Sequence, residues 1–378
     1  MPSFPNPRLA QAKTLPKTLR FSKMAKIDEL LTQMTERNAS DLHISAGSAP
    51  YLRVHGEMVK LNYRDVTPEV CQALIFEVLP ERQRQAFLEH SDLDCSYSLK
   101  GIGRFRVNVF KQRKGVGAVF RRIPERIQTI RELGLPEHLE NLLNLSEGLI
   151  LVTGPTGSGK STTLASLIHT INVTQKAHII TIEDPIEFVH QNEQSLINQR
   201  EVSSHTKSFH QALRAALRED PDVILVGEMR DLETISLALT AAETGHLVLA
   251  TLHTNSATKT VDRIIDVFPD AQQPQIRVML SESLRAVLAQ TLVRRTDGSG
   301  RAPVVEVLVN VPAVANLIRE GKTYQLHSSM QTGQVHGMVT FEGAVNDLMR
   351  KGIISREDGH GFLARRTVGR SSNGFQRA

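Results

Sequence analysis

Tryptophan is absent from this chain of 378 residues, and cysteine and tyrosine are rare, with two and four residues. Cys71 and Cys95 are far apart and belong to no CxxC pair, so neither a zinc site nor a disulfide framework is indicated. Apolar runs extend to about four residues, as at 149–152, whereas a membrane-spanning helix needs roughly 20. The basic N-terminus has no apolar segment of the kind that a secretory signal requires. These absences favour a protein of the reducing cytoplasm.

Positive charge is concentrated at the two ends of the chain. The formal net charge is +5, yet the first 23 residues carry five lysines and arginines, the last 20 carry four arginines, and neither stretch has an acid. Residues 24–358 are therefore net acidic, and we expect no nucleic-acid partner. Basic ends of this kind suit anionic lipid at a membrane surface. We expect residues 1–23 and 359–378 to be disordered, and Met24 is an alternative start.

Residues 24–122 have the pattern of a small α+β domain. Helical spacing at 26–37 and 66–90 is combined with strict alternation of apolar and polar residues at 41–45 and 104–110. This combination predicts an antiparallel sheet with helices. The proline- and glycine-containing segment 123–136 is expected to be a linker.

The pattern changes after the linker. Short runs of buried-type residues alternate with helical patterns, which is typical of a parallel sheet in an α/β domain. The runs are 149–152, 179–182, 223–226 and 247–252. We therefore predict an α/β domain over residues 137–358, with short helices at 312–356.

The strongest motif in the sequence matches the phosphate-binding pattern G-x-x-x-x-G-K-[ST]. It follows the apolar run 149–152 and precedes a helical pattern, which is the context that a P-loop requires. Backbone N–H groups would cradle phosphate oxygens, the lysine would reach the β- and γ-phosphates of ATP, and the serine would ligate Mg²⁺. The predicted nucleotide-binding residues are Gly154, Pro155, Thr156, Gly157, Ser158, Gly159, Lys160, Ser161 and Thr162.

Two apolar runs end in acids. Glu228 follows 223–226, with Gly227 where an aspartate is usual, and Glu183 follows 179–182. Ligands of parallel sheets bind at the carboxyl ends of the strands, so both carboxylates are expected near the γ-phosphate and Mg²⁺. Such a carboxylate can take a proton from an attacking water. We therefore predict Glu228 and Glu183 as catalytic residues.

Two histidines flank the run 247–252. His253 stands at its end, where a γ-phosphate sensor is expected, and His246 precedes it. We predict a catalytic role for His253 and nucleotide binding for His246. Residues 104–122 also contain several arginines, and phosphoryl transfer gains from an arginine supplied by a neighbouring subunit, which favours a ring assembly.

These motifs, in this order, resemble the secretion and type IV pilus motor ATPase superfamily, and most closely its pilus-retraction branch. The resemblance covers residues 24–356 and rests on the boxes GPTGSGKSTT, TIEDPIEFVH, DPDVILVGEMRD and AAETGHLVLATLHT. It implies a PAS-like N-terminal domain and a RecA-like P-loop core. It also implies that Glu228 is the catalytic glutamate, and that Arg106 and Arg121 contact nucleotide between domains or subunits.

The resemblance further implies partners and a location. It suggests a homohexamer that hydrolyses ATP with Mg²⁺ at the cytoplasmic face of the inner membrane, on a pilus platform protein, with a paralogous retraction ATPase as a further partner. One departure concerns the retraction-branch motif AIRNLIRE, which here reads AVANLIRE with Ala315 at the first arginine position. An accessory retraction motor is therefore one alternative.

Other functions are weighed against this interpretation. A pilus-assembly or type II secretion ATPase usually has a longer N-terminal region and a four-cysteine zinc module, which two cysteines cannot form. A nucleic-acid motor would need a basic, aromatic-bearing track. A nucleotide-binding regulator that hydrolyses little would not need both Glu183 and Glu228.

Overall fold

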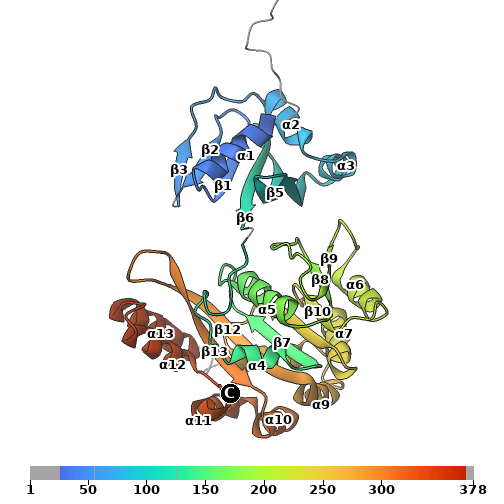
Figure 1. Cartoon of the computed structure of the whole chain (residues 1–378), viewed down its shortest axis with the longest axis vertical. Coiled ribbons are helices and arrows are strands. Elements are labelled where there is room, and N and C mark those ends of the chain that lie inside the picture. Colours follow the sequence, from blue (N-terminus) through green and yellow to red (C-terminus); the bar gives the residue numbers. More distant parts are fainter. Residues whose placement is uncertain (1–25, 55, 125, 372–378) are drawn as a thin grey trace, which may run out of the picture. The chain divides into compact units, whose positions relative to one another are not determined.

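The structure is a computed structural model that describes residues 26–54, 56–124 and 126–371 (Figure 1). The chain divides into two compact units between Arg122 and Ile123. The expected disorder of residues 1–23 lies outside the described residues. Each unit is described by itself.

The first unit is built on a six-stranded sheet in the order β3-β2-β1-β6-β5-β4. Apolar side chains of β5 alternate with polar ones, so Phe105, Val107 and Val109 are buried. Thr67 starts one helix by accepting the backbone N–H of Val70 at 3.4 Å. The elements are α1 (Lys26–Glu36), β1 (Asp41–Ser45), β2 (Tyr51–Val54), β3 (Glu57–Lys60), α2 (Pro68–Glu77), α3 (Glu81–His90), β4 (Asp92–Leu99), β5 (Gly103–Gln112) and β6 (Gly115–Ile123).

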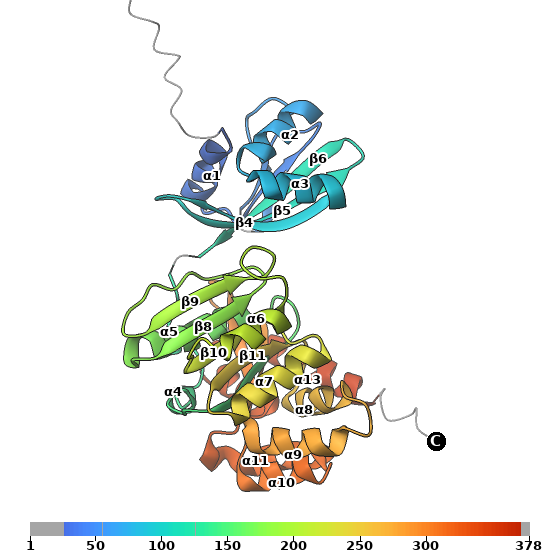
Figure 2. The same cartoon turned by 90° about the vertical axis from the view of Figure 1, so that its right-hand side faces the viewer.

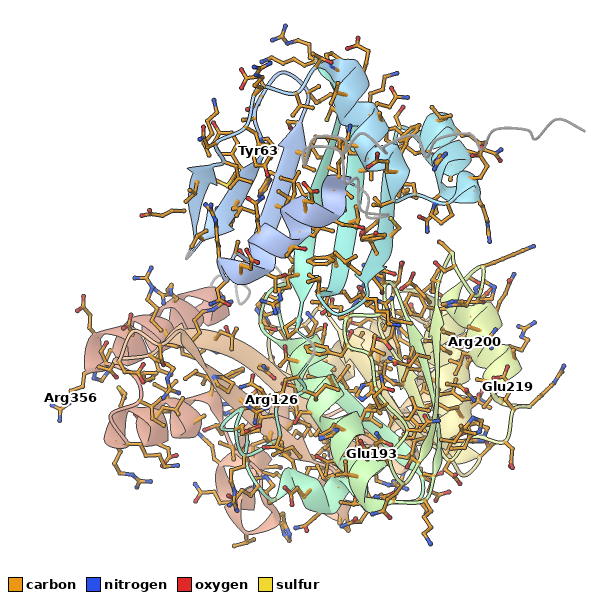
Figure 3. All side chains as sticks on the ribbon, turned by 45° about the horizontal axis from the view of Figure 1, so that its top comes forward. Tyr63, Arg126, Glu193, Arg200, Glu219 and Arg356 are labelled. Atoms are coloured by element: carbon orange, nitrogen blue, oxygen red, sulfur yellow. The ribbon has the colours of Figure 1, made fainter. Side chains whose placement is uncertain are left out.

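The second unit is built on a seven-stranded sheet in the order β13-β12-β7-β11-β10-β8-β9. Each neighbouring pair from β12 to β9 in this order is parallel, and only the edge strand β13 runs antiparallel to its neighbour β12. An Arg200–Glu219 ion pair of 2.9 Å ties β9 to the segment after α6 (Figure 3). The strands are β7 (Gly148–Thr153), β8 (His178–Glu183), β9 (Leu196–Glu201), β10 (Val223–Val226), β11 (Leu247–Leu252), β12 (Leu284–Arg294) and β13 (Arg301–Val309).

Helices cover both faces of this sheet (Figures 1 and 2). One face packs against α6 to α9, and the other packs against α4 and α5. Strands β7, β10 and β11 are buried along their whole length because both of their faces are covered. The helices are α4 (Leu139–Leu143), α5 (Lys160–Thr174), α6 (Phe209–Ala216), α7 (Leu232–Glu243), α8 (Ala257–Asp266), α9 (Gln273–Ser283), α10 (Pro312–Arg319), η1 (Thr323–Gln325), α11 (Leu326–Thr332), η2 (Gly333–His336), α12 (Phe341–Arg350) and α13 (Arg356–Ser371).

The register of the parallel strands fixes where their carboxyl ends lie. Thr153 of β7 pairs with Leu252 of β11, and Val226 of β10 pairs with Ala250 of β11 and Ile182 of β8. The segments that follow β7, β8, β10 and β11 therefore emerge at one edge of the sheet. These segments carry the four sequence motifs.

The prediction of disorder from residue 359 onward is wrong for residues 359–371, which belong to helix α13. The helix is stabilised by tertiary packing, because the ring of Phe362 meets that of Phe341 in α12 at a centroid distance of 5.8 Å. Polar and small residues around Phe362 hide this contact in the sequence. Residues 372–378 lie outside the described residues.

Two further features differ from the sequence expectation. The segment expected to be a linker, 123–136, buries Ile130 and Leu135 in the core shared with α4 and α5. Strands β12 and β13 were not predicted, because short apolar runs interrupted by single polar residues do not distinguish a buried strand from a buried helix.

Candidate nucleotide-binding site

The P-loop connects buried strand β7 to helix α5. Its glycines have backbone conformations that L side chains rarely adopt, with φ of 148° at Gly154, 78° at Gly157 and 88° at Gly159. A Cβ atom at Gly154 would overlap the carbonyl oxygen of Gln290 and lie 2.6 Å from the hydroxyl of Ser158. The loop can therefore close this tightly only with glycine at this position.

Lys160 begins helix α5, and its ammonium group lies over the loop. Its Nζ donates to the carbonyl oxygens of Gly154 at 2.9 Å and Pro155 at 3.2 Å. Burial lowers the pKa of Lys160, while the charges of Glu228 and Glu187 act in the opposite direction. A cation beside a helix N-terminus and a tight glycine loop is the arrangement that binds phosphate.

The chain's residues fit a phosphate group in this loop. The hydroxyl of Ser158 is buried and has no hydrogen-bond partner within the described residues. Ser161 and Thr162 follow Lys160 in the first turn of α5, where helix N–H groups have no intrahelical acceptor. A bound phosphate would satisfy such donors.

Gln290 of β12 supports the loop from the side, and sequence reasoning missed it. Its side chain is 4% exposed, donates to the carbonyl oxygen of Ser158 at 2.8 Å and accepts from the hydroxyl of Thr163 at 2.7 Å. A single amide thus ties the P-loop and helix α5 to the neighbouring strand. A glutamine within an otherwise mostly apolar run is the sequence signal that could have indicated this residue, because a polar group in a buried strand needs a hydrogen-bond partner.

We expect Gln290→Leu to lower the free energy of unfolding by about 2–4 kcal/mol, because it leaves two buried polar groups without partners. Nucleotide affinity should fall with it, since the loop loses its lateral support. Chemical denaturation and direct ATP binding measure the two effects. Gln272→Leu, at the start of α9 and away from the loop, is the control. Unchanged stability in Gln290→Leu would contradict the bracing role.

Glu228 follows β10, one residue after Gly227. A Cβ atom at Gly227 would lie 3.0 Å from the carbonyl oxygen of Ile182 and 3.2 Å from the Cα atom of Glu183. The glycine that replaces the usual aspartate therefore allows the ends of β10 and β8 to approach closely. It also brings the two predicted carboxylates onto adjacent strand ends.

The carboxylate of Glu228 is held by two basic side chains. Arg230 donates to it through Nε and Nη2 at 2.5 and 2.7 Å, and Nε2 of His253 lies 2.9 Å from Oε1. Burial raises the pKa of Glu228, but the hydrogen bonds and charges of Arg230 and His253 outweigh it, so the pKa is below its usual value. The sequence predicted that Glu228 and His253 each lie near the γ-phosphate, and it gave no indication of Arg230.

Glu183 ends β8 in a more enclosed environment. Its Oε1 accepts from the hydroxyl of Thr181 at 2.7 Å and from Nε2 of Gln199 at 3.2 Å. Burial raises the pKa of Glu183, and these two hydrogen bonds only partly oppose it. Glu183 and Glu228 therefore sit on neighbouring strands with pKa values displaced in opposite directions.

The prediction that His246 contacts nucleotide at this chain's P-loop is wrong. His246 precedes β11, and its carbonyl oxygen accepts the backbone N–H of Gly148 at the start of β7. It therefore lies at the opposite edge of the sheet from the P-loop, which follows the end of β7. Its Nδ1 lies 3.0 Å from the carbonyl oxygen of Ala241, so its contacts are with the end of α7.

Arg106 and Arg121 belong to the first unit. Arg106 of β5 forms a bidentate pair with Asp94 of β4, and Arg121 of β6 donates to buried Asp41 at 2.8 Å. Both are thus oriented by acids of their own sheet. Their contact with nucleotide stays a prediction.

The described residues contain no cluster of three or more histidine, cysteine, aspartate or glutamate side chains that could bind a metal ion by itself. Mg²⁺ usually takes one or two protein ligands and completes its shell with phosphate oxygens and water. Ser161, at the N-terminus of α5, is placed for such a shared site.

A P-loop after β7, a carboxylate after β10 and a histidine after β11 define a P-loop nucleotide-binding protein with a RecA-like core. The family model described as Type II/IV secretion system protein matches residues 21–360. The chain belongs to this family, and it is an ATPase. The predicted fold class, an α/β P-loop core preceded by a smaller α+β domain, is confirmed.

Similar sequences indicate the branch of this family to which the chain is related. The chain is 52% identical over 332 residues to the type IV pilus retraction ATPase PilT of Pseudomonas aeruginosa, covering 88% of this chain and 96% of the relative. It is 53% identical over 308 residues to the twitching motility protein of Neisseria gonorrhoeae, covering 82% of each. The type IV pilus ATPase PilU of Pseudomonas aeruginosa is 44% identical over 331 residues, covering 88% and 87%. The resemblance to the pilus-retraction branch is confirmed.

Solved structures agree with this placement. A crystal structure of the pilus retraction motor PilT with bound ADP matches with a TM-score of 0.83 and 49% identity, covering 88% of this chain and 96% of that one. The ATPase DotB of Legionella pneumophila matches with a TM-score of 0.79 and 30% identity, covering 89% and 95%. The fold is thus shared over nearly the whole of both proteins. A nucleotide site in this chain is consistent with the ADP of the retraction motor.

Proposed function

We propose that this chain is the ATP-hydrolysing motor that powers retraction of a type IV pilus, and so supports twitching motility. The observation that carries the proposal is the 52% identity to a retraction ATPase over 96% of that relative's length. The conjunction of Lys160, Glu228 and His253 at one sheet edge supports the hydrolytic step.

The residues take distinct roles in this proposal. The P-loop amides and Lys160 bind the phosphates of ATP, and Ser161 contributes a ligand to Mg²⁺, which neutralises charge on the phosphates when it is bound. Glu228 accepts a proton from the attacking water. Glu183, at the same edge of the sheet, helps to orient the reacting groups. His253 senses whether a γ-phosphate is bound and affects Glu228 through their 2.9 Å contact.

The working assembly is proposed to be a homohexamer. An arginine that approaches a neighbour's phosphates stabilises charge that develops in phosphoryl transfer, and Arg106 and Arg121 are the candidates. The ring would act on a platform protein at the cytoplasmic face of the inner membrane. None of the helices in the described residues combines the length and the apolar character needed to cross a bilayer.

An experiment in cells tests the direction of movement. We expect a deletion strain to be hyperpiliated and unable to twitch, because pili would be assembled and not withdrawn. Electron microscopy and a surface-motility assay measure both properties. A strain without pili would instead indicate an assembly ATPase.

An accessory retraction motor is the second candidate. Ala315 stands where the retraction-branch motif has an arginine, and this observation favours it. In that case the deletion strain would keep twitching through a paralogous ATPase, and twitching would be lost only when both genes are deleted.

We expect Arg230→Ala to move the acidic limb of the pH profile of kcat/KM to higher pH. Arg230 lowers the pKa of Glu228, so its removal raises the pH at which the carboxylate becomes available as a base. Lys160, whose charge also acts on Glu228, and His253, which contacts its carboxylate, are unchanged. Steady-state ATP hydrolysis over a pH series measures the shift.

Arg218→Ala is the matched control, because Arg218 is an exposed arginine that follows α6. Its profile should overlay that of the unmodified protein. An unshifted acidic limb in Arg230→Ala would mean that Glu228 does not set it.

A further inference from the structure

The final turns of α13 lie beyond residue 360, where the family match ends, yet they pack on the ATPase unit. Figure 1 shows α13 beside α12, at the β12–β13 side of the sheet. Phe362 of α13 meets Phe341 of α12 edge to face, with an interplanar angle of 61°. This aromatic pair fixes the direction of the helix.

The guanidinium group of Arg366, one turn after Phe362, packs against the two aromatic rings. Its guanidinium carbon lies 3.8 Å from the ring centroid of Phe341 and 5.6 Å from that of Phe362. Its Nη2 donates to the main-chain carbonyl oxygen of Asn255 at 2.9 Å. A guanidinium held on aromatic faces keeps a fixed orientation, so this hydrogen bond is directed.

Asn255 belongs to the loop 253–256 between β11 and α8. His253 starts this loop and lies 2.9 Å from Glu228, and Ser256 ends it by capping α8. The hydroxyl of Thr254 is 2.6 Å from that of Thr260. The loop is thus fixed at its α8 end, and Arg366 holds its middle.

A cavity of about 610 Å³ adjoins this loop. Its lining includes Asn255, Lys259, Arg294, Phe362, Arg365 and Arg366. The loop is therefore not packed against protein on this side, and Arg366 supplies a contact from α13 across to it. Without that contact the carbonyl group of Asn255 would face the cavity and the loop would gain freedom.

We propose that Arg366 is a positioning residue for ATP hydrolysis: it anchors the loop that places His253 beside Glu228. The inference rests on the proposed roles of His253 and Glu228. Arg366 does not touch the nucleotide in this proposal. It acts through the backbone of Asn255, so it should influence turnover more than nucleotide affinity, because a small displacement of a reacting group slows the chemical step.

The test uses the full chain with Arg366→Ala, Arg366→Lys and Arg365→Ala. We expect Arg366→Ala to lower kcat about tenfold and to leave the Kd for ATP within about twofold. Arg366→Lys, which keeps the charge and one donor, should recover part of the rate. Arg365→Ala removes an exposed arginine of the same helix and cavity and should match the unmodified protein. Thermal melting checks that α13 stays folded.

A double-mutant cycle separates positioning from a general effect on structure. In a His253→Ala background, Arg366→Ala should change kcat by less than about twofold, because the residue that it positions is gone. Equal losses in both backgrounds would overturn the proposal, as would an unchanged kcat in Arg366→Ala. If His253→Ala leaves kcat unchanged, the proposed role of His253 itself fails. If His253→Ala lowers kcat and Arg366→Ala does not, only the positioning by Arg366 fails.

Discussion

Lys160→Ala should raise the Kd for ATP at least about 100-fold. The ammonium group would otherwise make charge-assisted hydrogen bonds to the phosphates, and two such bonds account for a loss of about 2.8 kcal/mol. The substitution also frees the carbonyl oxygens of Gly154 and Pro155, which Lys160 holds at 2.9 and 3.2 Å. Equilibrium binding of a fluorescent ATP analogue, with Mg²⁺ present, measures the change.

Lys176→Ala provides the control for this loss. Lys176 is an exposed lysine just past the end of α5, so it has the same charge and lies on the same segment of chain. Its affinity for ATP should be unchanged. ATP binding of normal strength by Lys160→Ala would remove this loop as the phosphate site.

Glu228→Gln should spare ATP binding and lower kcat about 1000-fold. The amide keeps the size of the side chain but can no longer accept a proton from water at neutral pH. The charge of Glu228 acts on Lys160, but Lys160 itself donates to the loop carbonyl oxygens, so the Kd for ATP should stay within about threefold. Phosphate release under saturating ATP measures kcat, and direct binding measures Kd.

Glu233→Gln is the matched control for Glu228→Gln. Glu233 lies in the first turn of α7 with its side chain 65% exposed, and it should retain full turnover. Because the amide places a donor against Arg230 or His253, a thermal melt should accompany the kinetics. Hydrolysis at the unmodified rate by a folded Glu228→Gln protein would exclude Glu228 as the proton acceptor.

The P-loop and its neighbours could be predicted from sequence because each is a local feature. A glycine loop between a buried strand and a helix specifies its own conformation, and Lys160 then has a single place to lie. Parallel strands with covered faces must expose their carboxyl ends at one edge, which brings Glu183, Glu228 and His253 together. Periodicity and the order of motifs were sufficient for these statements.

The prediction that His246 lies at the P-loop is wrong for a simple physical reason. His246 and His253 flank one strand, and a strand of six residues spans about 20 Å, so the two histidines cannot share one phosphate. Proximity in the motif suggested proximity in space. The register of β11 against β7 decides otherwise.

The contacts of Gln290, Arg230 and Arg366 could not be predicted from the sequence, because each contact forms only when the chain has folded around the side chain. Gln290 meets Ser158 across 132 positions, and Arg366 meets Asn255 across 111. Neither lies in a recognisable motif. Arg230 stands within the Glu228 motif, but only the fold of the turn brings its guanidinium onto the carboxylate.

The class of chemistry, the nucleotide loop and the sheet edge where it occurs follow from local backbone preferences and strand order, so they can be predicted from the amino-acid pattern alone. Three other features depend on contacts between distant parts of the folded chain: the side chains that support that edge, the inclusion of residues 359–371 in a helix, and the distance of His246 from the P-loop. Long-range packing carries this information, since a buried amide, an aromatic pair or a strand register has meaning only when its partner is in place.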